Sequence, residues 1–273
     1  MTHRATRRSL LLGGAAAAAL TAASLPGSAY AETPYGPGVY GRTPSDGSAP
    51  DGSPPGGDGP EIGILLYDGF SLLDATGPAE VLSRLLGARV TMIGERRGQV
   101  RTDTGDVRVT AERSIAETDR LDVLLVPGAG NRGTIASMEN RALLGWIRRV
   151  HRHTGWTTSV CTGSLILAAA GLLDGRRATT YWASADYLRT HFDVTVVPER
   201  FVRSGKIVTA AGVSAGLDMA LYLTSLIAGD TTAQAIQLAV EYDPRPPFDS
   251  GDATKADREL KELALRLLSE SQV

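Results

Sequence analysis

From Glu61 onward, short apolar runs alternate with stretches that have helical periodicity. This alternation predicts strand–helix units and a mainly parallel sheet with helices on both faces, because parallel strands are joined by helical crossovers. The continuous apolar run at 122–126 is typical of a strand buried on both faces. We therefore predict an α/β fold and one domain over residues 61–273.

The predicted elements follow from period, length and turn residues. Strands are expected at 62–67, 89–94, 122–126, 157–160, 178–181 and 194–197, with a hairpin at 201–209 that turns at Ser204-Gly205. Helices are expected at 78–86, 139–153, 162–170, 183–190, 214–228, 231–241 and 254–269. Pro78 is placed in the first turn of its helix, where proline is tolerated.

The chain has one cysteine, Cys161, at the point where a predicted strand runs into a predicted helix. A side chain at such a turn is held clear of the backbone, and the amides of the following helix face any negative charge beside it. We expect these amides to lower the pKa of the thiol and make Cys161 a nucleophile. The residues alone leave a second interpretation open, in which Cys161 is a small buried hydrophobic residue.

Ligands of open α/β sheets bind beyond the carboxyl ends of the strands. Three loops should meet there: the loop that holds Asp74, the turn at 127–130, and the turn at Cys161. We predict the functional site at this edge. A loop aspartate such as Asp74 is also a common turn former, and Gly128 could serve turn geometry alone.

The charge balance excludes some classes of partner. The chain has 28 basic and 30 acidic residues, and its first 31 residues hold three arginines and no acid, which leaves 25 basic against 30 acidic residues beyond them. This composition does not favour binding to nucleic acid or to anionic membranes. The spacing of cysteine and histidine gives no metal site, and G-x-G-x-x-G at 128–133 lacks the acidic residue expected about 20 residues later in a dinucleotide fold.

The N-terminus predicts export. Arg7-Arg8, an apolar alanine-rich run and Ala29-Tyr30-Ala31 are typical of a twin-arginine signal peptide over residues 1–31, cleaved after Ala31. Residues 32–60, rich in Pro, Gly, Ser and Asp, predict a disordered linker. We expect an extracellular or cell-envelope protein without stable membrane insertion, in which a single cysteine cannot form an internal disulfide.

Several motifs together resemble the ThiJ/PfpI superfamily, which has the class I glutamine amidotransferase-like fold. They are Asp68-Gly69-Phe70, Asp74-Ala75-Thr76-Gly77-Pro78, Val126-Pro127-Gly128 and Val160-Cys161-Thr162-Gly163-Ser164. Within the superfamily, Ala211-Gly212-Val213-Ser214-Ala215-Gly216 and Glu241-Tyr242-Asp243-Pro244 resemble the isonitrile hydratase branch. The resemblance covers residues 62–251.

The resemblance implies a flavodoxin-like three-layer sandwich with a nucleophile elbow, commonly a homodimer. It implies a lyase that hydrates an isonitrile to the N-substituted formamide without metal or organic cofactor. Cys161 would be the nucleophile that forms a thioimidate, and Asp74 the acid–base group, protonated by burial. Thr162 would hydrogen-bond the thiol or the intermediate, and Gly128 would offer a backbone donor to developing charge.

One position departs from the superfamily. Where members often have histidine in a Thr-Thr-His-Trp run, this chain has Thr179-Thr180-Tyr181-Trp182, so Tyr181 replaces the histidine and could alter the polarity of the substrate pocket. All four histidines of the chain are expected at the surface, which argues against Cys-His protease or glyoxalase chemistry. Two other functions stay open: a non-enzymatic ligand-binding or redox-sensing module, and a thiol hydrolase of the same fold with another substrate.

Overall fold

The computed structural model describes residues 59–272. The predicted signal peptide and all but the last two residues of the predicted linker lie outside this range. Among residues 59–272, no helix combines the length and apolar character needed to cross a bilayer.

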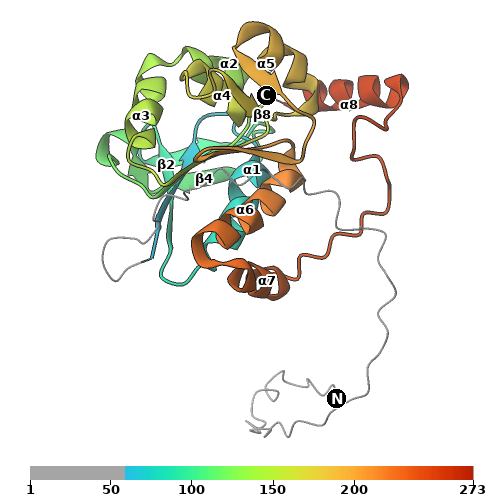
Figure 1. Cartoon of the computed structure of the whole chain (residues 1–273). Helices are drawn as coiled ribbons and strands as arrows, with labels where there is room; N and C mark the ends of the chain where they lie inside the picture. The colour runs from blue at the N-terminus through green and yellow to red at the C-terminus, as the bar shows by residue number, and fades with distance from the viewer. Residues whose placement is uncertain (1–58, 273) are drawn as a thin grey trace, which may run out of the picture. The chain divides into compact units, whose positions relative to one another are not determined.

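A sheet runs through the centre of the fold (Figure 1). It has seven strands in the order β10-β11-β7-β6-β1-β2-β5. Its strands are β1 (Glu61–Leu66), β2 (Arg89–Gly94), β5 (Arg113–Ser114), β6 (Val123–Val126), β7 (Trp156–Val160), β10 (Phe201–Ser204) and β11 (Ile207–Ala210). All neighbours pair in parallel except β10 and β11, which form the expected hairpin. The strands expected at 62–67, 89–94, 122–126 and 157–160 are confirmed.

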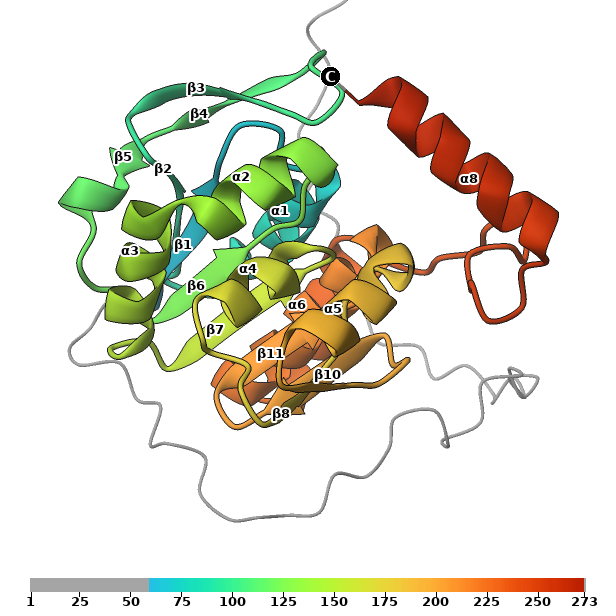
Figure 2. The ribbon, with the colours of Figure 1, turned by 90° about the horizontal axis from the view of Figure 1, so that it is seen from above.

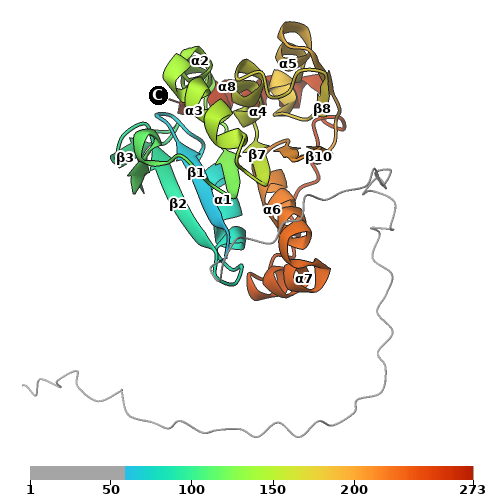
Figure 3. The ribbon, with the colours of Figure 1, turned by 60° about the vertical axis from the view of Figure 1, so that its left-hand side comes forward.

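Helices cover both faces of the sheet, so the predicted flavodoxin-like three-layer sandwich is confirmed (Figures 1 and 3). One face carries α1 (Leu72–Leu82), α6 (Val213–Ala228) and α7 (Asp230–Ala239). The other carries α2 (Asn131–Glu139), α3 (Arg141–His151), α4 (Gly163–Ala169) and α5 (Ala185–His191). A short helix, η2 (Trp182–Ser184), precedes α5, and a small parallel pair, β8 (Arg176–Ala178) with β9 (Val194–Val196), lies beside β10.

Helix α1 corrects one prediction. It begins at Leu72 rather than at Pro78, which lies in its interior. An interior proline cannot donate to the carbonyl of the residue four before it, here Asp74, and normally disfavours a helix. The helix persists because Gly77, Pro78, Val81 and Leu82 are buried, and because α1 packs against α6. Tertiary packing therefore overrides local propensity.

The sequence predicted one helix over 139–153, whereas the structure has two helices around Asn140. Asn140 has extended backbone angles and caps α3 by accepting a hydrogen bond from the amide of Leu143 at 3.1 Å. This N-cap ends α2 and starts α3. Helix α2 was not predicted.

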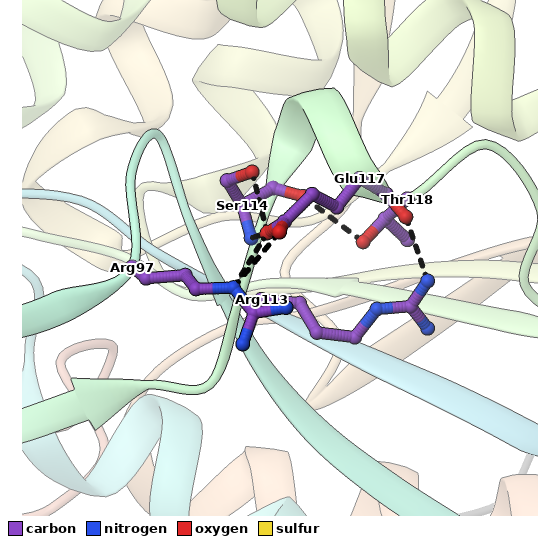
Figure 4. A network of polar contacts seen from close by, with 5 residues as sticks. All are labelled: Arg97, Arg113, Ser114, Glu117 and Thr118. Atoms are coloured by element: carbon purple, nitrogen blue, oxygen red, sulfur yellow. Dashed lines mark hydrogen bonds and ion pairs between the residues drawn. The ribbon is translucent and has the colours of Figure 1, made fainter.

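A hairpin of β3 (Gly98–Arg101) and β4 (Arg108–Ala111) was also not predicted, and it lies over the end of β1 (Figure 2). At its base, a polar network connects the residue before β3 to η1 (Ile115–Glu117) (Figure 4). The Glu117 carboxylate accepts hydrogen bonds from Arg97 at 2.8 and 2.9 Å and from Ser114. The bond from Arg97, followed by those from Ser114, lowers the pKa of Glu117 to about 2.

The terminal helix α8 (Arg258–Ser271) lies outside the sandwich (Figure 2). None of its residues is buried, and its leucines are 38 to 56% exposed. Its N-terminal half and residues 250–256 form one side of a shallow hollow whose other side is Trp182. The side chain of Gln272, just after α8, lies against Gly130.

Candidate active site

The sharp turn predicted at Cys161 is present between β7 and α4. Cys161 has φ of +57°, in the left-handed region that non-glycine residues rarely adopt. Its amide donates to the carbonyl of Ala210 at 3.0 Å, and its own carbonyl accepts from the hydroxyls of Ser164 and Thr180 at 3.1 and 3.2 Å. These three hydrogen bonds hold the strained backbone that presents the thiol at the carboxyl end of the sheet.

Two glycines allow the turn to lie close to the neighbouring loop. A Cβ atom on Gly163 would lie 2.2 Å from the carbonyl oxygen of Val126. A Cβ atom on Gly128 would lie 2.7 Å from both Cys161 Cβ and Asp74 Oδ2. Gly128 is therefore needed for close approach of the three segments, which is a more specific role than turn geometry.

Asp74 lies in the first turn of α1 and not in a loop, which corrects the predicted placement. Its side chain is completely buried. Oδ2 accepts a hydrogen bond from the Gly128 amide at 3.1 Å, whereas Oδ1 has no partner of hydrogen-bonding geometry. The backbone donor expected at Gly128 thus serves the Asp74 carboxyl.

Burial is the main cause that raises the pKa of Asp74, to about 7. The Gly128 amide and the Cys161 thiol act in the opposite direction as hydrogen-bond donors, and the charge of Asp103 adds to the rise. A carboxyl group with such a pKa can give or take a proton near neutral pH.

The expected net lowering of the Cys161 pKa is wrong, although an amide of the turn does act in the expected direction. The thiol is only 7% exposed, and burial raises its pKa well above the usual value. The charge of Asp74 adds to the rise, while the Thr162 amide lowers the pKa by less than these effects raise it. The thiol and the carboxyl therefore compete for protons in one buried pair.

Thr162 lies directly after the cysteine, but its hydroxyl binds the 127–130 turn. Oγ1 is 2.9 Å from the Ala129 amide, 3.1 Å from the Ala129 carbonyl oxygen and 2.9 Å from Thr134 Oγ1. The backbone amide of Thr162 faces the thiol and lowers its pKa. Of the two hydrogen-bonding roles expected for Thr162, the geometry supports the one through its amide.

Comparison with known proteins places this arrangement in a family. Residues 60–226 match the DJ-1/PfpI family. The chain belongs to this family. It is 41% identical to an isonitrile hydratase of Pseudomonas putida over 196 residues, which cover 72% of this chain and 84% of the relative.

Two further relatives of this DJ-1/PfpI chain show that proteins of this family carry different functional names. A solved structure of a ThiJ/PfpI family protein from Pseudomonas syringae has a TM-score of 0.73 and 32% identity, covering 85% of this chain and 94% of that one. An HTH-type transcriptional regulator of Pseudomonas aeruginosa is 30% identical over 65% of this chain and 52% of the regulator. The family therefore includes chains named as enzymes and chains named as regulators.

In this DJ-1/PfpI chain, Tyr181 lies near Cys161. It is half-buried, and burial followed by the charge of Cys161 raises the pKa of its phenol. Its ring centroid is 5.5 Å from that of Trp182, which borders the hollow beside α8. The residue that departs from the superfamily pattern is thus close enough to the thiol to respond to its charge and also contacts a residue that borders the hollow.

Sequence reasoning missed Tyr67, a buried tyrosine at the site. Its hydroxyl donates to the Pro127 carbonyl at 2.7 Å, and burial raises its pKa well above the usual value, with Asp74 and Cys161 adding to the rise. The available signal was an aromatic residue with a hydroxyl at the end of the first predicted strand, where a buried tyrosine needs a polar partner.

The surface position expected for the histidines is wrong for His151, which is half-buried near the start of β7. Its Nδ1 is 2.8 Å from Thr157 Oγ1, and burial, with Lys206 and Arg176, lowers its pKa to about 4. His153 and His191 are exposed, and His3 lies outside the described residues. Within residues 59–272, no three His, Cys, Asp or Glu side chains gather as metal ligands.

Proposed function

We propose that this chain hydrates an isonitrile to the N-substituted formamide and is therefore a lyase. The observation that carries the proposal is the buried carboxyl of Asp74, with a pKa of about 7, beside the only thiol of the chain. The 41% identity to an isonitrile hydratase supports the same reaction. Neither feature requires a cofactor.

In the first step, Asp74 takes the thiol proton, and the Cys161 thiolate attacks the terminal carbon of R–N≡C. The carbon–sulfur bond forms, and the protonated Asp74 gives its proton to the same carbon. The product is a thioimidate, Cys161–S–CH=N–R. Asp74 ends this step as a carboxylate and can then act as a base.

In the second step, Asp74 takes a proton from water as the hydroxide adds to the thioimidate carbon, and it passes that proton to nitrogen. The tetrahedral adduct then loses sulfur while Asp74 takes the hydroxyl proton. This collapse releases R–NH–CHO and returns the thiolate and the protonated carboxyl. Protons and electrons balance without a redox partner.

Three neighbouring residues support this scheme. The Thr162 amide contacts the sulfur and stabilises negative charge on it as the carbon–sulfur bond breaks. Tyr181, half-buried near the thiol, contributes an aromatic surface and a hydroxyl toward the R group. The Gly128 amide keeps Oδ2 of Asp74 fixed, so the proton moves through Oδ1.

The test is formamide production from cyclohexyl isocyanide by residues 32–273. Cys161→Ala and Asp74→Asn should each lower kcat/KM by at least about 100-fold, while Asp106→Asn, an exposed aspartate, should not change it. Full activity in Cys161→Ala would contradict the covalent scheme. No turnover by the unmodified chain, with selective oxidation of Cys161, would favour a redox-sensing module.

We also propose that the chain is exported by the twin-arginine route and acts as a homodimer outside the cytoplasm. The arginine pair and the A-x-A site support export. Replacement of Arg7 and Arg8 by lysine should leave the precursor inside the cell, and sedimentation of residues 32–273 should give twice the chain mass. Unchanged secretion of the lysine variant, or a single-chain mass, would contradict the respective proposal.

A further inference from the structure

The first turn of α1 has the sequence of a capping box but not its hydrogen bonds. Ser71 is the N-cap and Asp74 the third helical residue, the spacing at which the two side chains normally bond each other's backbone amides. In this structure the Ser71 side chain makes no cap hydrogen bond. The Asp74 carboxyl accepts instead from Gly128.

The Ser71 hydroxyl is hydrogen-bonded to Asp103. Ser71 Oγ donates to Asp103 Oδ2 at 2.8 Å, and the other carboxylate oxygen of Asp103 accepts from the Thr104 amide at 2.9 Å. The Ser71 amide, the other half of a capping box, donates to the Gly128 carbonyl at 2.8 Å. Both groups that would hold Asp74 in a cap are therefore engaged elsewhere.

The backbone fixes Asp103 in this position. It lies in the turn of the β3–β4 hairpin, and its amide donates to the Phe70 carbonyl at 3.0 Å. The Gly69 amide donates to the Arg101 carbonyl at 2.9 Å, and Arg101 pairs with Asp68 at 3.3 Å. The hairpin is thus attached to the segment that leads into α1.

We propose that Asp103 is a positioning residue, which holds the Ser71 hydroxyl away from Asp74 and so leaves the Asp74 carboxyl directed at Cys161. Without Asp103, the Ser71 hydroxyl is free to accept a hydrogen bond from the backbone amide of Asp74. The capping box is then completed when the Asp74 carboxyl moves to the Ser71 amide in place of the Gly128 carbonyl. Asp74 then turns from the thiol. The inference rests on the proposed function for the role of Asp74, but the contact between Asp74 and Cys161 can be measured without a substrate.

Two charged groups act on the thiol, Asp74 from α1 and Asp103 from the hairpin. Tyr67 after β1 and Tyr181 before η2 are the other titratable groups nearby, and the charge of Cys161 raises the pKa of each. Loss of the Asp103 charge alone lowers the pKa of Cys161, and withdrawal of Asp74 lowers it further. The two effects can be separated, because only the second requires the Ser71 hydroxyl.

The experiment measures the rate of alkylation by iodoacetamide between pH 6 and 10. Because Cys161 is the only cysteine, all thiol alkylation reports this site. At pH 8, Asp103→Ala should react at least about threefold faster than Asp103→Ala/Ser71→Ala, because the thiolate fraction rises as the pKa of Cys161 falls. Ser71→Ala alone should react like the unmodified chain, and so should Asp106→Ala in the same hairpin.

Equal rates for Asp103→Ala and the double variant would overturn the proposal, since the effect would then be that of charge alone. A faster rate in Ser71→Ala would also overturn it. If Asp103→Ala does not fold, Asp103→Asn provides the test: it keeps an acceptor for Ser71 and should show no further change on Ser71→Ala. If Asp103→Ala is alkylated threefold faster than Asp103→Ala/Ser71→Ala but the unmodified chain produces no formamide, this inference is retained and the proposed function is rejected.

Discussion

At the scale of single residues, the absence of a side chain at Gly128 decides how closely the thiol and the carboxyl can approach. A methyl group there would overlap Cys161 Cβ and Asp74 Oδ2, both at 2.7 Å, and the Thr162 amide nitrogen at 2.8 Å. Cys161 Cβ and the Thr162 nitrogen are fixed by the backbone, and Asp74 Oδ2 ends a short, completely buried side chain. The site must therefore open to accept alanine.

Gly128→Ala should destabilise the protein by about 1 to 3 kcal/mol and raise the reactivity of Cys161 by separating it from Asp74. Gly145→Ala is the matched control, because a Cβ atom there meets nothing within 4 Å and Gly145 lies inside α3. That control should gain about 1 kcal/mol. Urea denaturation measures the free energy of unfolding of both variants. Equal changes in this free energy for Gly128→Ala and Gly145→Ala would contradict the close approach at Gly128.

At the scale of elements, α1 is held in place by α6. Gly216 of α6 lies against Val160, the residue before Cys161, and against Pro78 of α1. A Cβ atom on Gly216 would be 3.1 Å from both methyl groups of Val160 and 3.4 Å from Pro78. The helix packing thus extends to the turn that carries Cys161.

Gly216→Ala should cost about 1 to 2 kcal/mol in free energy of unfolding, since the methyl groups of Val160 must move. Val160→Ala in the same background makes room, so the two changes should be less than additive. A double-mutant cycle in urea gives the coupling. Simple additivity would show that the two side chains do not compete for space.

Helix α8 differs from α6 in how little of it is covered. Leu263→Ala, at a leucine that is 39% exposed, should cost less than about 1 kcal/mol, whereas Leu223→Ala, at a completely buried leucine of α6, should cost about 2 to 5 kcal/mol. Thermal unfolding compares the two. A similar cost at both positions would mean that a second chain covers α8 in solution.

The elements also show what the sequence could predict. Strands β1 and β6 have apolar runs, and their burial follows those runs, whereas β7 is fully buried although its three central residues are Thr and Ser. Strands β3 and β4 are short and mostly exposed, so no apolar pattern marked them, and Asp103 in their turn was missed. Cys161, Asp74 and Gly128 were predicted to meet because loops at the carboxyl ends of parallel strands converge. The raised pKa of Cys161 was not predicted, because it depends on burial, which only the tertiary structure determines.

At the scale of the whole molecule, a buried and a half-buried titratable group lie at different ends of β7. Asp74 lies beside Cys161 after the end of the strand, and its pKa is raised to about 7. His151 contacts Thr157 near the start, and its pKa is lowered to about 4. Lys206 donates to the His151 carbonyl and, at 2.9 Å, to that of Thr154, which confines the cationic side chain to that end.

These two shifts have opposite effects on stability. Folded Asp74 binds its proton more tightly than unfolded Asp74, so this group stabilises the fold increasingly as pH falls from 7 to 4. Folded His151 binds its proton less tightly, so it destabilises the fold as pH falls from 6.5 to 4. Asp74→Asn should therefore lose more stability than the unmodified chain on acidification, and His151→Gln should lose less. Melting temperatures from pH 4 to 8 measure this; parallel profiles would contradict the shifts.

Because the chain has a single thiol, oxidation of Cys161 cannot be reversed within the chain. A sulfenic acid formed at Cys161 finds no second thiol in its own chain with which to condense, since the sequence has one cysteine. Its repair requires a thiol from another molecule that is small enough to reach a side chain only 7% exposed. Reduction of the oxidised Cys161 therefore requires an external thiol. Without such a reductant, the fraction of molecules with an oxidised Cys161 should rise with exposure to peroxide.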